Sequence, residues 1–146
     1  MKNTAGKAPK VFLDTNILID YLLFRGGDSI AAEQIIDAAM DLRAELHVAA
    51  HSLTNAYYIL RKEYSPAERK FIIRNICALL KVDPVSGESI EKAITDGLAE
   101  DLEDALQIRC AIDSDCDYFV TRDAELFEGC PVKTLLPDEL LRELFL

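Results

Sequence analysis

Three short segments of the chain carry acidic residues at positions where a carboxylate could do chemistry. The apolar run "VFL" ends in Asp14, "DLEDALQIRCA" contains Asp101 and Asp104, and "DYFVT" is followed by Arg122 and Asp123. A charged group directly after a buried strand is costly unless a partner makes use of its charge. These acids are therefore the first candidates for a functional site.

Each of these acids also has a structural interpretation as a helix cap. Asp14 can accept hydrogen bonds at the start of a helix, although Thr15 or Asn16 could cap that helix instead and leave Asp14 free for function. Asp101 is well placed to cap the helix that follows it, and Asp123 can cap a short helical stretch. We expect Asp14 to be functional and leave both interpretations of Asp101 and Asp123 open.

Asp104 has the weaker structural alternative. It lies three residues after Asp101 and shares a helix face with it. On the helical wheel it lies beside Ile108 and Ala111, so it does not belong to a purely polar side. We therefore expect Asp104 to be a site residue, whereas Glu103 points elsewhere and is expected to be solvated.

Carboxylates that are brought together repel one another. A pair about 4 Å apart costs roughly 4 kcal/mol at an effective dielectric constant near 20, so a cluster of acids either takes up protons or binds a cation. Ligation by oxygen alone favours Mg²⁺ or Mn²⁺, which keep several waters and reach out to phosphates. The chemistry that suits such a site is metal-assisted hydrolysis of a phosphodiester.

Five apolar, β-rich runs are the elements that would position these acids. They alternate with segments of helical periodicity, which indicates a mostly parallel sheet covered on both faces. In such sheets ligands bind outside the carboxyl ends of the strands, where the strand order reverses. If the first and fourth strands are neighbours, Asp14 and Asp123 meet at that edge. The expected strands are residues 11–14, 46–50, 81–85, 117–121 and 132–136, of which 81–85 is the weakest.

Helix signals fill the intervals between the expected strands. In "AAEQIIDAAM" the apolar residues form one face, and "NAYYILRKEY" shows a similar spacing. Ser65 before Pro66 marks the start of a further helix. The segments 86–99 and 101–112 are predicted to be two helices separated near Gly97.

Length and composition are those of one ordinary domain. The chain has 146 residues, half of them apolar, and we expect a flexible tail over residues 1–10 and a single domain over residues 11–146. No apolar stretch approaches the roughly 20 residues that span a bilayer, and the N-terminus has no signal-peptide segment. We therefore expect a cytoplasmic protein with no membrane partner. The four cysteines form no C-x-x-C pair and are expected to be reduced and mostly in the core.

The charge distribution limits how the chain could bind nucleic acid. Its formal net charge of −10 at pH 7 argues against a protein that holds phosphates by bulk positive potential. It leaves open a protein that works through a bound cation. Seven acids and a single lysine lie between residues 88 and 104, whereas residues 61–81 carry six bases and two acids. The first region could hold a metal, and the second could meet phosphate or an acidic partner.

Four segments, in this order, resemble the PIN domain family, in the branch of VapC-type bacterial toxin-like ribonucleases: "VFLDTNILIDYLL", "SLTNAYYILRK", "DLEDALQIRCA" and "DYFVTRD". The resemblance runs from about Val11 to the C-terminus. It implies an α/β fold, a three-layer α/β/α sandwich whose five-stranded parallel sheet has the order 3-2-1-4-5. It also implies metal-dependent cleavage of RNA, commonly by a homodimer, and for the toxins an antitoxin protein that occupies the site.

The resemblance implies roles for individual residues. Asp14, Asp104 and Asp123 match the family acids that act in catalysis and hold Mg²⁺ or Mn²⁺. Thr15 and Thr121 match hydroxyl positions that hold the carboxylates in place.

One position departs from the family pattern. Many PIN domains carry a glutamate on the helix after the second strand, where this chain has Asn55. An amide can ligate a metal or position a water, but it removes a negative charge and so weakens the binding of a hard cation. Asn55 could instead pair with Ser52 in a capping arrangement at the helix start. Asp101 could restore the missing charge as a further catalytic acid.

These observations lead to a divalent-metal-dependent endoribonuclease as the leading interpretation, and to a candidate toxin of a toxin–antitoxin pair. Arg122 and the bases between Arg61 and Lys81 would anchor the RNA backbone. A second interpretation, motivated by Asn55, is a catalytically weak or silent PIN fold that binds RNA or a protein. A third is a small phosphatase or a flap-type DNA nuclease built on the same acids. The apolar excess on the helices around residues 55–62 and 71–80 favours a homodimer.

Overall fold

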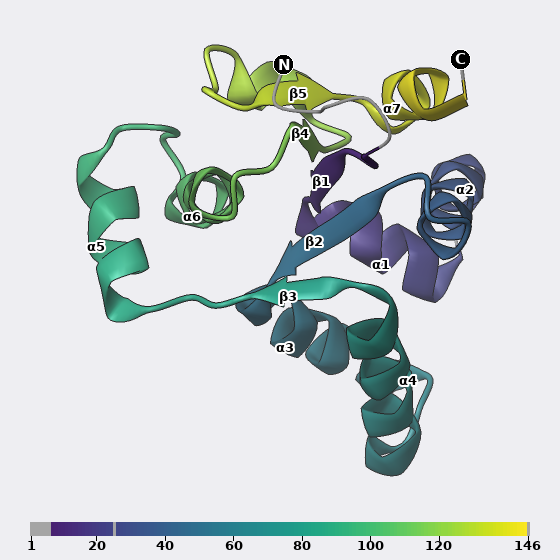
Figure 1. The fold of residues 1–146 in the computed structure, drawn as a ribbon. Coiled ribbons are helices and arrows are strands. Elements are labelled where there is room, and N and C mark those ends of the chain that lie inside the picture. Colours follow the sequence, from purple (N-terminus) through teal and green to yellow (C-terminus); the bar gives the residue numbers. More distant parts are fainter. Residues whose placement is uncertain (1–6, 25, 146) are drawn as a thin grey trace.

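A five-stranded parallel sheet forms the middle of the molecule. The computed structural model describes residues 7–24 and 26–145. The strand order is β3-β2-β1-β4-β5, so the expected order is confirmed (Figure 1). Each strand lies within two residues of the range that the sequence predicts. The strands are β1 (Lys10–Leu13), β2 (Glu45–Ala49), β3 (Lys81–Asp83), β4 (Tyr118–Val120) and β5 (Lys133–Leu135).

The first strand is the centre of the sheet, with β2 on one side and β4 on the other. Phe12 pairs with His47 of β2 and with Phe119 of β4. The pairing continues past the end of β1, because the backbone N–H of Asp14 donates to the carbonyl oxygen of Val120 at 2.9 Å. The carboxyl ends of β1 and β4 therefore lie side by side at the point where the strand order reverses.

Helices cover both faces of the sheet, which gives the expected three layers (Figure 1). On one face lie α5 and α6, and on the other lie α1, α2, α3, α4 and α7. Short 3₁₀ helices follow α3 and β4. The helices are α1 (Thr15–Leu23), α2 (Gly27–Met40), α3 (Ala50–Ile59), η1 (Leu60–Lys62), α4 (Pro66–Leu79), α5 (Gly87–Thr95), α6 (Leu102–Asp113), η2 (Ala124–Phe127) and α7 (Pro137–Phe145).

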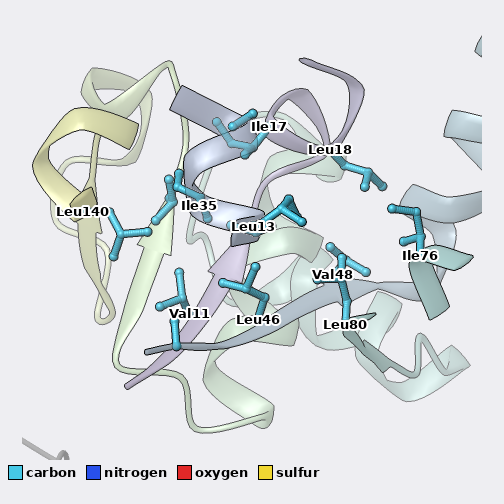
Figure 2. Packing of buried hydrophobic residues seen from close by; sticks show 14 of the residues in the cluster. Val11, Leu13, Ile17, Leu18, Ile35, Leu46, Val48, Ile76, Leu80 and Leu140 are labelled. Atoms are coloured by element: carbon cyan, nitrogen blue, oxygen red, sulfur yellow. The ribbon is translucent and has the colours of Figure 1, made fainter. Parts of the chain in front are cut away.

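Two apolar clusters hold these layers together. Successive residues of a strand point to opposite faces, so Val11 and Leu13 pack into the larger cluster, whereas Phe12 packs with α6. The rings of Phe12 and Phe119 stack with their centroids 5.9 Å apart. Burial on both faces explains why these strands are continuous apolar runs in the sequence. Figure 2 shows the larger cluster, with Val11, Leu13, Ile17, Leu18, Ile35, Leu46, Val48, Ile76, Leu80 and Leu140 labelled.

Local signals in the sequence correspond to the observed helix ends. Ser65 caps α4, where it forms a reciprocal capping box with Glu68. Between α5 and α6, Gly97 has a φ of +65°, a conformation that favours glycine and separates the two predicted helices. On α3 the expected apolar spacing includes Tyr58, but this side chain is 60% exposed.

The N-terminal segment, the cysteines and the hydropathy of the helices were the subjects of the expectations from composition. The expected tail over residues 1–10 lies partly outside the described residues, which begin at residue 7, and β1 begins at Lys10 within that segment. Cys110 and Cys116 are buried, Cys77 is exposed, and all four cysteines are free thiols. Across residues 7–24 and 26–145, no helix has the length and hydropathy that crossing a membrane requires.

Candidate functional site

An open cavity of about 300 Å³ lies at the carboxyl ends of β1 and β4. Three of the acids that the sequence singles out contribute to it, together with the supporting residue Thr15 and the candidate RNA-binding residue Arg122. Its described lining consists of Asp14, Thr15, Asn16, Ile19, Glu103, Asp104, Arg122 and Asp123. Asp14 and Asp123 were expected to meet at this edge of the sheet, and both line the cavity there.

Asp14 is buried directly after the carboxyl end of β1, and both oxygens of its carboxylate accept hydrogen bonds. Its Oδ2 accepts a hydrogen bond from Thr121 Oγ1 at 2.7 Å, and its Oδ1 accepts one from the backbone N–H of Thr15 at 2.8 Å. Burial raises the pKa of Asp14 to about 6; the Thr121 hydrogen bond opposes this shift, and the charges of Glu103 and Asp104 add to it. Asp14 is also the N-cap of α1. The alternative in which Thr15 or Asn16 caps this helix is therefore wrong.

Thr121 links the acid after β1 to the acid after β4. Its buried hydroxyl donates to Asp14 and accepts from the backbone N–H of Asp123 at 3.1 Å. Asn16 Nδ2 lies 3.3 Å from Asp123 Oδ2 and 3.5 Å from Thr121 Oγ1. These bonds hold two carboxylates at one edge of the cavity. Asp123 does not cap η2 through its side chain.

Asp104 and Asp101 occupy different positions at the start of α6. Asp104 is half-buried in the cavity wall, and burial raises its pKa, with the charges of Asp101, Glu103 and Asp123 adding to the shift. Asp101 is exposed and caps α6, where its carboxylate accepts a hydrogen bond from the backbone N–H of Asp104 at 3.1 Å. Asp101 is absent from the described cavity lining, so the structure favours its interpretation as a cap.

Glu103 lines the cavity, so the expectation that it points elsewhere is wrong, although its side chain is 42% exposed to solvent. Its Oε2 is 2.9 Å from His51 Nε2 and 3.0 Å from Gln107 Nε2. Burial alone would raise the pKa of Glu103, but the hydrogen bonds to His51 and Gln107 outweigh it and hold that pKa below its usual value. The signal in the sequence is the spacing of Glu103 and Gln107, which are four residues apart and therefore adjacent on the helix surface.

Gln107 is the centre of a buried polar network behind the cavity. Its side chain is fully buried, and Nε2 lies 2.9 Å from Thr15 Oγ1 and 3.1 Å from Ser52 Oγ. The two hydroxyls are 2.6 Å apart. An amide nitrogen carries only two hydrogens, so it donates to two of the neighbouring acceptors at a time. Sequence reasoning missed His51 and Gln107 as members of the site.

Asn55 lies outside the cavity lining. It is exposed on α3, a helix that begins at Ala50 without a side-chain cap. The predicted pairing of Asn55 with Ser52 in a capping arrangement is wrong, because the Ser52 hydroxyl contacts Thr15 and Gln107 instead.

Arg122 stands between the acidic cavity and a larger one. Its Nε lies 2.7 Å from Asp20 Oδ2, and a terminal nitrogen lies 3.6 Å from Asp28 Oδ2. The second cavity, of about 650 Å³, shares Arg122 and Asp123 with the first. The two cavities therefore meet at these residues. The second cavity is lined by Gly27, Asp28, Ala31, Arg122, Asp123, Leu136, Pro137 and Asp138.

The donor atoms at this site suit a hard cation. Among the described residues, the polar lining of the acidic cavity offers carboxylate, hydroxyl and amide oxygens and no thiol or imidazole. Oxygen is the donor type that Mg²⁺ and Mn²⁺ prefer. Within residues 7–24 and 26–145, no three His, Cys, Asp or Glu side chains lie close enough to hold a metal ion together. Mg²⁺ usually takes one or two protein carboxylates and keeps several waters, so it does not need three converged acids.

Comparisons with known proteins agree with this fold. The sequence pattern of the PIN domain family matches residues 10–125. No curated protein sequence matches the chain. A solved toxin–antitoxin complex from Klebsiella pneumoniae is similar, with 20% identity, a TM-score of 0.66, and coverage of 87% of this chain and 97% of that chain. VapBC2 from Rickettsia felis, solved with a promoter DNA fragment, has 15% identity, a TM-score of 0.61 and coverage of 87% and 98%. VapC20 from Mycobacterium tuberculosis, described as a toxin that cleaves the sarcin-ricin loop, has 14% identity, a TM-score of 0.57 and coverage of 75% and 86%.

Proposed function

The chain belongs to the PIN domain family, and from this premise we propose that it is a divalent-metal-dependent endoribonuclease. Members of this family are usually nucleases that use divalent metals. The observation that carries the proposal is the single cavity at the carboxyl ends of β1 and β4, which Asp14, Asp104 and Asp123 all line.

We assign these three acids as the residues around a bound Mg²⁺ or Mn²⁺, of which one or two would ligate the ion and the others would bind its water ligands. The raised pKa values of Asp14 and Asp104 support this assignment, because a cation would offset the cost of burying and crowding their negative charges. The Thr121 hydroxyl and the Thr15 backbone N–H fix both oxygens of Asp14, so that its orientation is set before a ligand arrives. The Thr15 hydroxyl, which was expected to hold a carboxylate, contacts Ser52 and Gln107 instead. When bound, the metal would supply a Lewis acid for the phosphoryl oxygen and an activated water for hydrolysis.

We assign Arg122 to binding the phosphates of the RNA. Its ion pair with Asp20 holds the guanidinium at the junction of the two cavities, while its side chain stays 38% exposed. A guanidinium matches the oxygens of a phosphate group in a planar, two-point contact. A single strand that crosses this junction would place a phosphate beside both Arg122 and Asp123.

The solved neighbours support an antitoxin protein as a partner of this chain. One of these structures is a toxin–antitoxin complex and another is a VapBC complex. We propose that this chain acts in the cytoplasm, pairs with an antitoxin protein and forms a homodimer.

Calorimetric titration with Mn²⁺ tests the metal site directly. We expect saturable binding to the wild type and its loss in Asp14→Asn. The matched control is Asp37→Asn, which removes one exposed carboxylate from α2 outside the cavity lining and should bind normally. Cleavage of a single-stranded RNA in the presence of Mn²⁺ should be lost in Asp14→Asn and retained in Asp37→Asn. Equal cleavage by all three proteins would show that the acidic cavity is not the active site.

Asn55, at a position where many PIN domains carry a glutamate, favours one alternative function, that of a binding protein without catalytic activity. A catalytically silent PIN fold would bind RNA or an antitoxin and leave the RNA intact at every divalent-metal concentration. Parallel assays on a chromogenic phosphate ester and on branched DNA distinguish ribonuclease activity from phosphatase or flap nuclease activity.

A further inference from the structure

We propose that Glu103 is a fourth acid of this site, which takes the place of the glutamate that many PIN domains carry where this chain has Asn55. We further assign His51 and Gln107 as the residues that position Glu103. This inference rests on the proposed metal-dependent function. It differs from the sequence-based expectation, in which Asp101 restores the missing charge.

The position of Glu103 supports this assignment first. Glu103 lines the same cavity as Asp14, Asp104 and Asp123, whereas Asn55 and Asp101 are exposed and absent from that lining. The α3 helix, which carries Asn55, still contributes to the site through His51 in its first turn. His51 reaches from α3 to the Glu103 carboxylate on α6 at 2.9 Å. A side chain of α3 therefore holds an acid that α6 supplies to the cavity, although the described lining contains no α3 residue.

The hydrogen-bond chemistry fixes the direction of this contact. An ionised carboxylate has no hydrogen to donate, so His51 must carry a proton on Nε2 and donate it to Glu103 Oε2. Gln107 Nε2 also lies 3.0 Å from Oε2. Both of these hydrogen bonds use Oε2, and no hydrogen bond to Oε1 is found among the described residues, which leaves that oxygen available to a ligand in the cavity.

Gln107 also couples Glu103 to the first acid. The same amide nitrogen is 2.9 Å from the hydroxyl of Thr15, whose backbone N–H donates to Asp14. Gln107 is fully buried, and its amide nitrogen lies within hydrogen-bond distance of both the Thr15 hydroxyl and the Glu103 carboxylate. A buried donor that contacts two walls of the cavity sets the relative orientation of their ligands, as outer-shell partners do in metal sites.

Mn²⁺ calorimetry on purified variants tests the role of Glu103. We expect Glu103→Gln to weaken Mn²⁺ binding at least about tenfold. The matched control is Glu100→Gln, which removes an exposed carboxylate three residues earlier and should bind as the wild type does. Melting temperatures without metal should confirm that both variants are folded.

Two substitutions at His51 test its positioning role separately. His51→Ala should weaken Mn²⁺ binding because Glu103 loses a donor, and His51→Gln should restore most of it because the glutamine amide nitrogen can occupy the place of Nε2. If the role of His51 were purely structural, His51→Ala would lower the melting temperature, but the Mn²⁺ affinity would not be lost in His51→Ala and restored in His51→Gln.

The outcomes separate this inference from the proposed function. If Asp14→Asn loses Mn²⁺ binding and Glu103→Gln keeps it, the assignment of Glu103 is overturned and the proposed metal site stands. If His51→Ala binds as tightly as the wild type, the positioning role is overturned. If the wild type itself binds no Mn²⁺, both the proposed function and this inference fail.

Discussion

Asp14 is both a helix cap and a buried acid of the cavity, and burying its negative charge costs free energy. It caps α1, and it is 6% exposed beneath a cavity that contains further acids. The hydroxyl of Thr121 compensates part of the cost of its charge, since a hydrogen bond to a charged group contributes roughly 1.5–3 kcal/mol. The pKa of about 6 indicates that this compensation is incomplete in the metal-free protein.

The pH dependence of stability should therefore carry a contribution from Asp14. Its folded pKa of about 6 exceeds the ordinary value of 3.8, so the folded state binds the extra proton and stability falls as the pH rises between these values. The metal-free wild type should lose up to about 3 kcal/mol relative to Asp14→Asn between pH 3.5 and pH 7, at about 1.4 kcal/mol per pKa unit. Urea unfolding in the presence of a chelator measures this difference.

The comparison between the two proteins isolates the ionisation of Asp14. The asparagine also loses a hydrogen-bond acceptor, but that loss does not depend on pH and shifts the whole curve equally. Parallel stability curves for the wild type and Asp14→Asn from pH 3.5 to pH 7 would show that Asp14 has an ordinary pKa.

Residue types at strand ends made most of the acidic site predictable from the sequence. Asp14 and Asp123 follow buried strands, and the topology alone brings such positions together. Glu103 could not be placed in this way. The side of α6 that faces the cavity depends on contacts between α6 and α3. One of these contacts joins Glu103 to His51, which lies 52 positions earlier in the sequence. The buried role of Gln107 depends on the same packing.

The strands differ in how clearly the sequence predicts them, and this difference follows their burial. Central strands are apolar along their whole length because both of their faces are covered, and β1 and β4 are buried almost throughout. The edge strand β3 is mostly exposed and contains only one apolar residue, which explains why its sequence signal was the weakest. Side-chain contacts add to the ladder that holds β3 to β2.

A buried histidine forms one of these contacts between β2 and β3. His47 lies 3.0 Å from Asp83 Oδ1 and 2.7 Å from Glu45 Oε2. Burial lowers the pKa of His47, but the two carboxylates outweigh it and raise that pKa above 6.5. Folding therefore favours the protonated imidazole, and its stabilisation is fully present below pH 6.5 and is lost as the pH rises through the folded pKa.

The stability difference between the wild type and His47→Gln should therefore decrease as the pH rises from 6 to 8.5. Chemical unfolding at several pH values measures it. Asp83→Asn should reduce the same pH dependence, because it removes the carboxylate with the larger effect on the imidazole. The exposed Asp37→Asn should leave it unchanged. A wild-type advantage over His47→Gln that is constant across this range would contradict the role assigned to the ion pair.

The outer surface of the molecule carries exposed apolar side chains on α4. Phe71 of α4 is 65% exposed and Leu79 is 39% exposed. Both line an open cavity of about 400 Å³ that also includes Tyr21 and Tyr64. The lining also contains Glu33 and Asn75, and exposed apolar side chains rimmed by polar residues commonly mark a protein interface. Its position on α4 coincides with the segment whose apolar excess favoured a homodimer in the sequence.

We expect this surface to form the interface between two copies of the chain. Light scattering of the wild type at micromolar concentration should give about twice the chain mass of 16.3 kDa. Phe71→Glu should give the monomer mass, because a charge buried at an apolar interface loses its hydration without gaining a partner. The control Ile94→Glu adds the same charge at a residue that is 63% exposed on α5, on the opposite side of the sheet, and should remain dimeric. A wild type with the monomer mass would refute the homodimer, and a dimeric Phe71→Glu would place its interface elsewhere on the molecule.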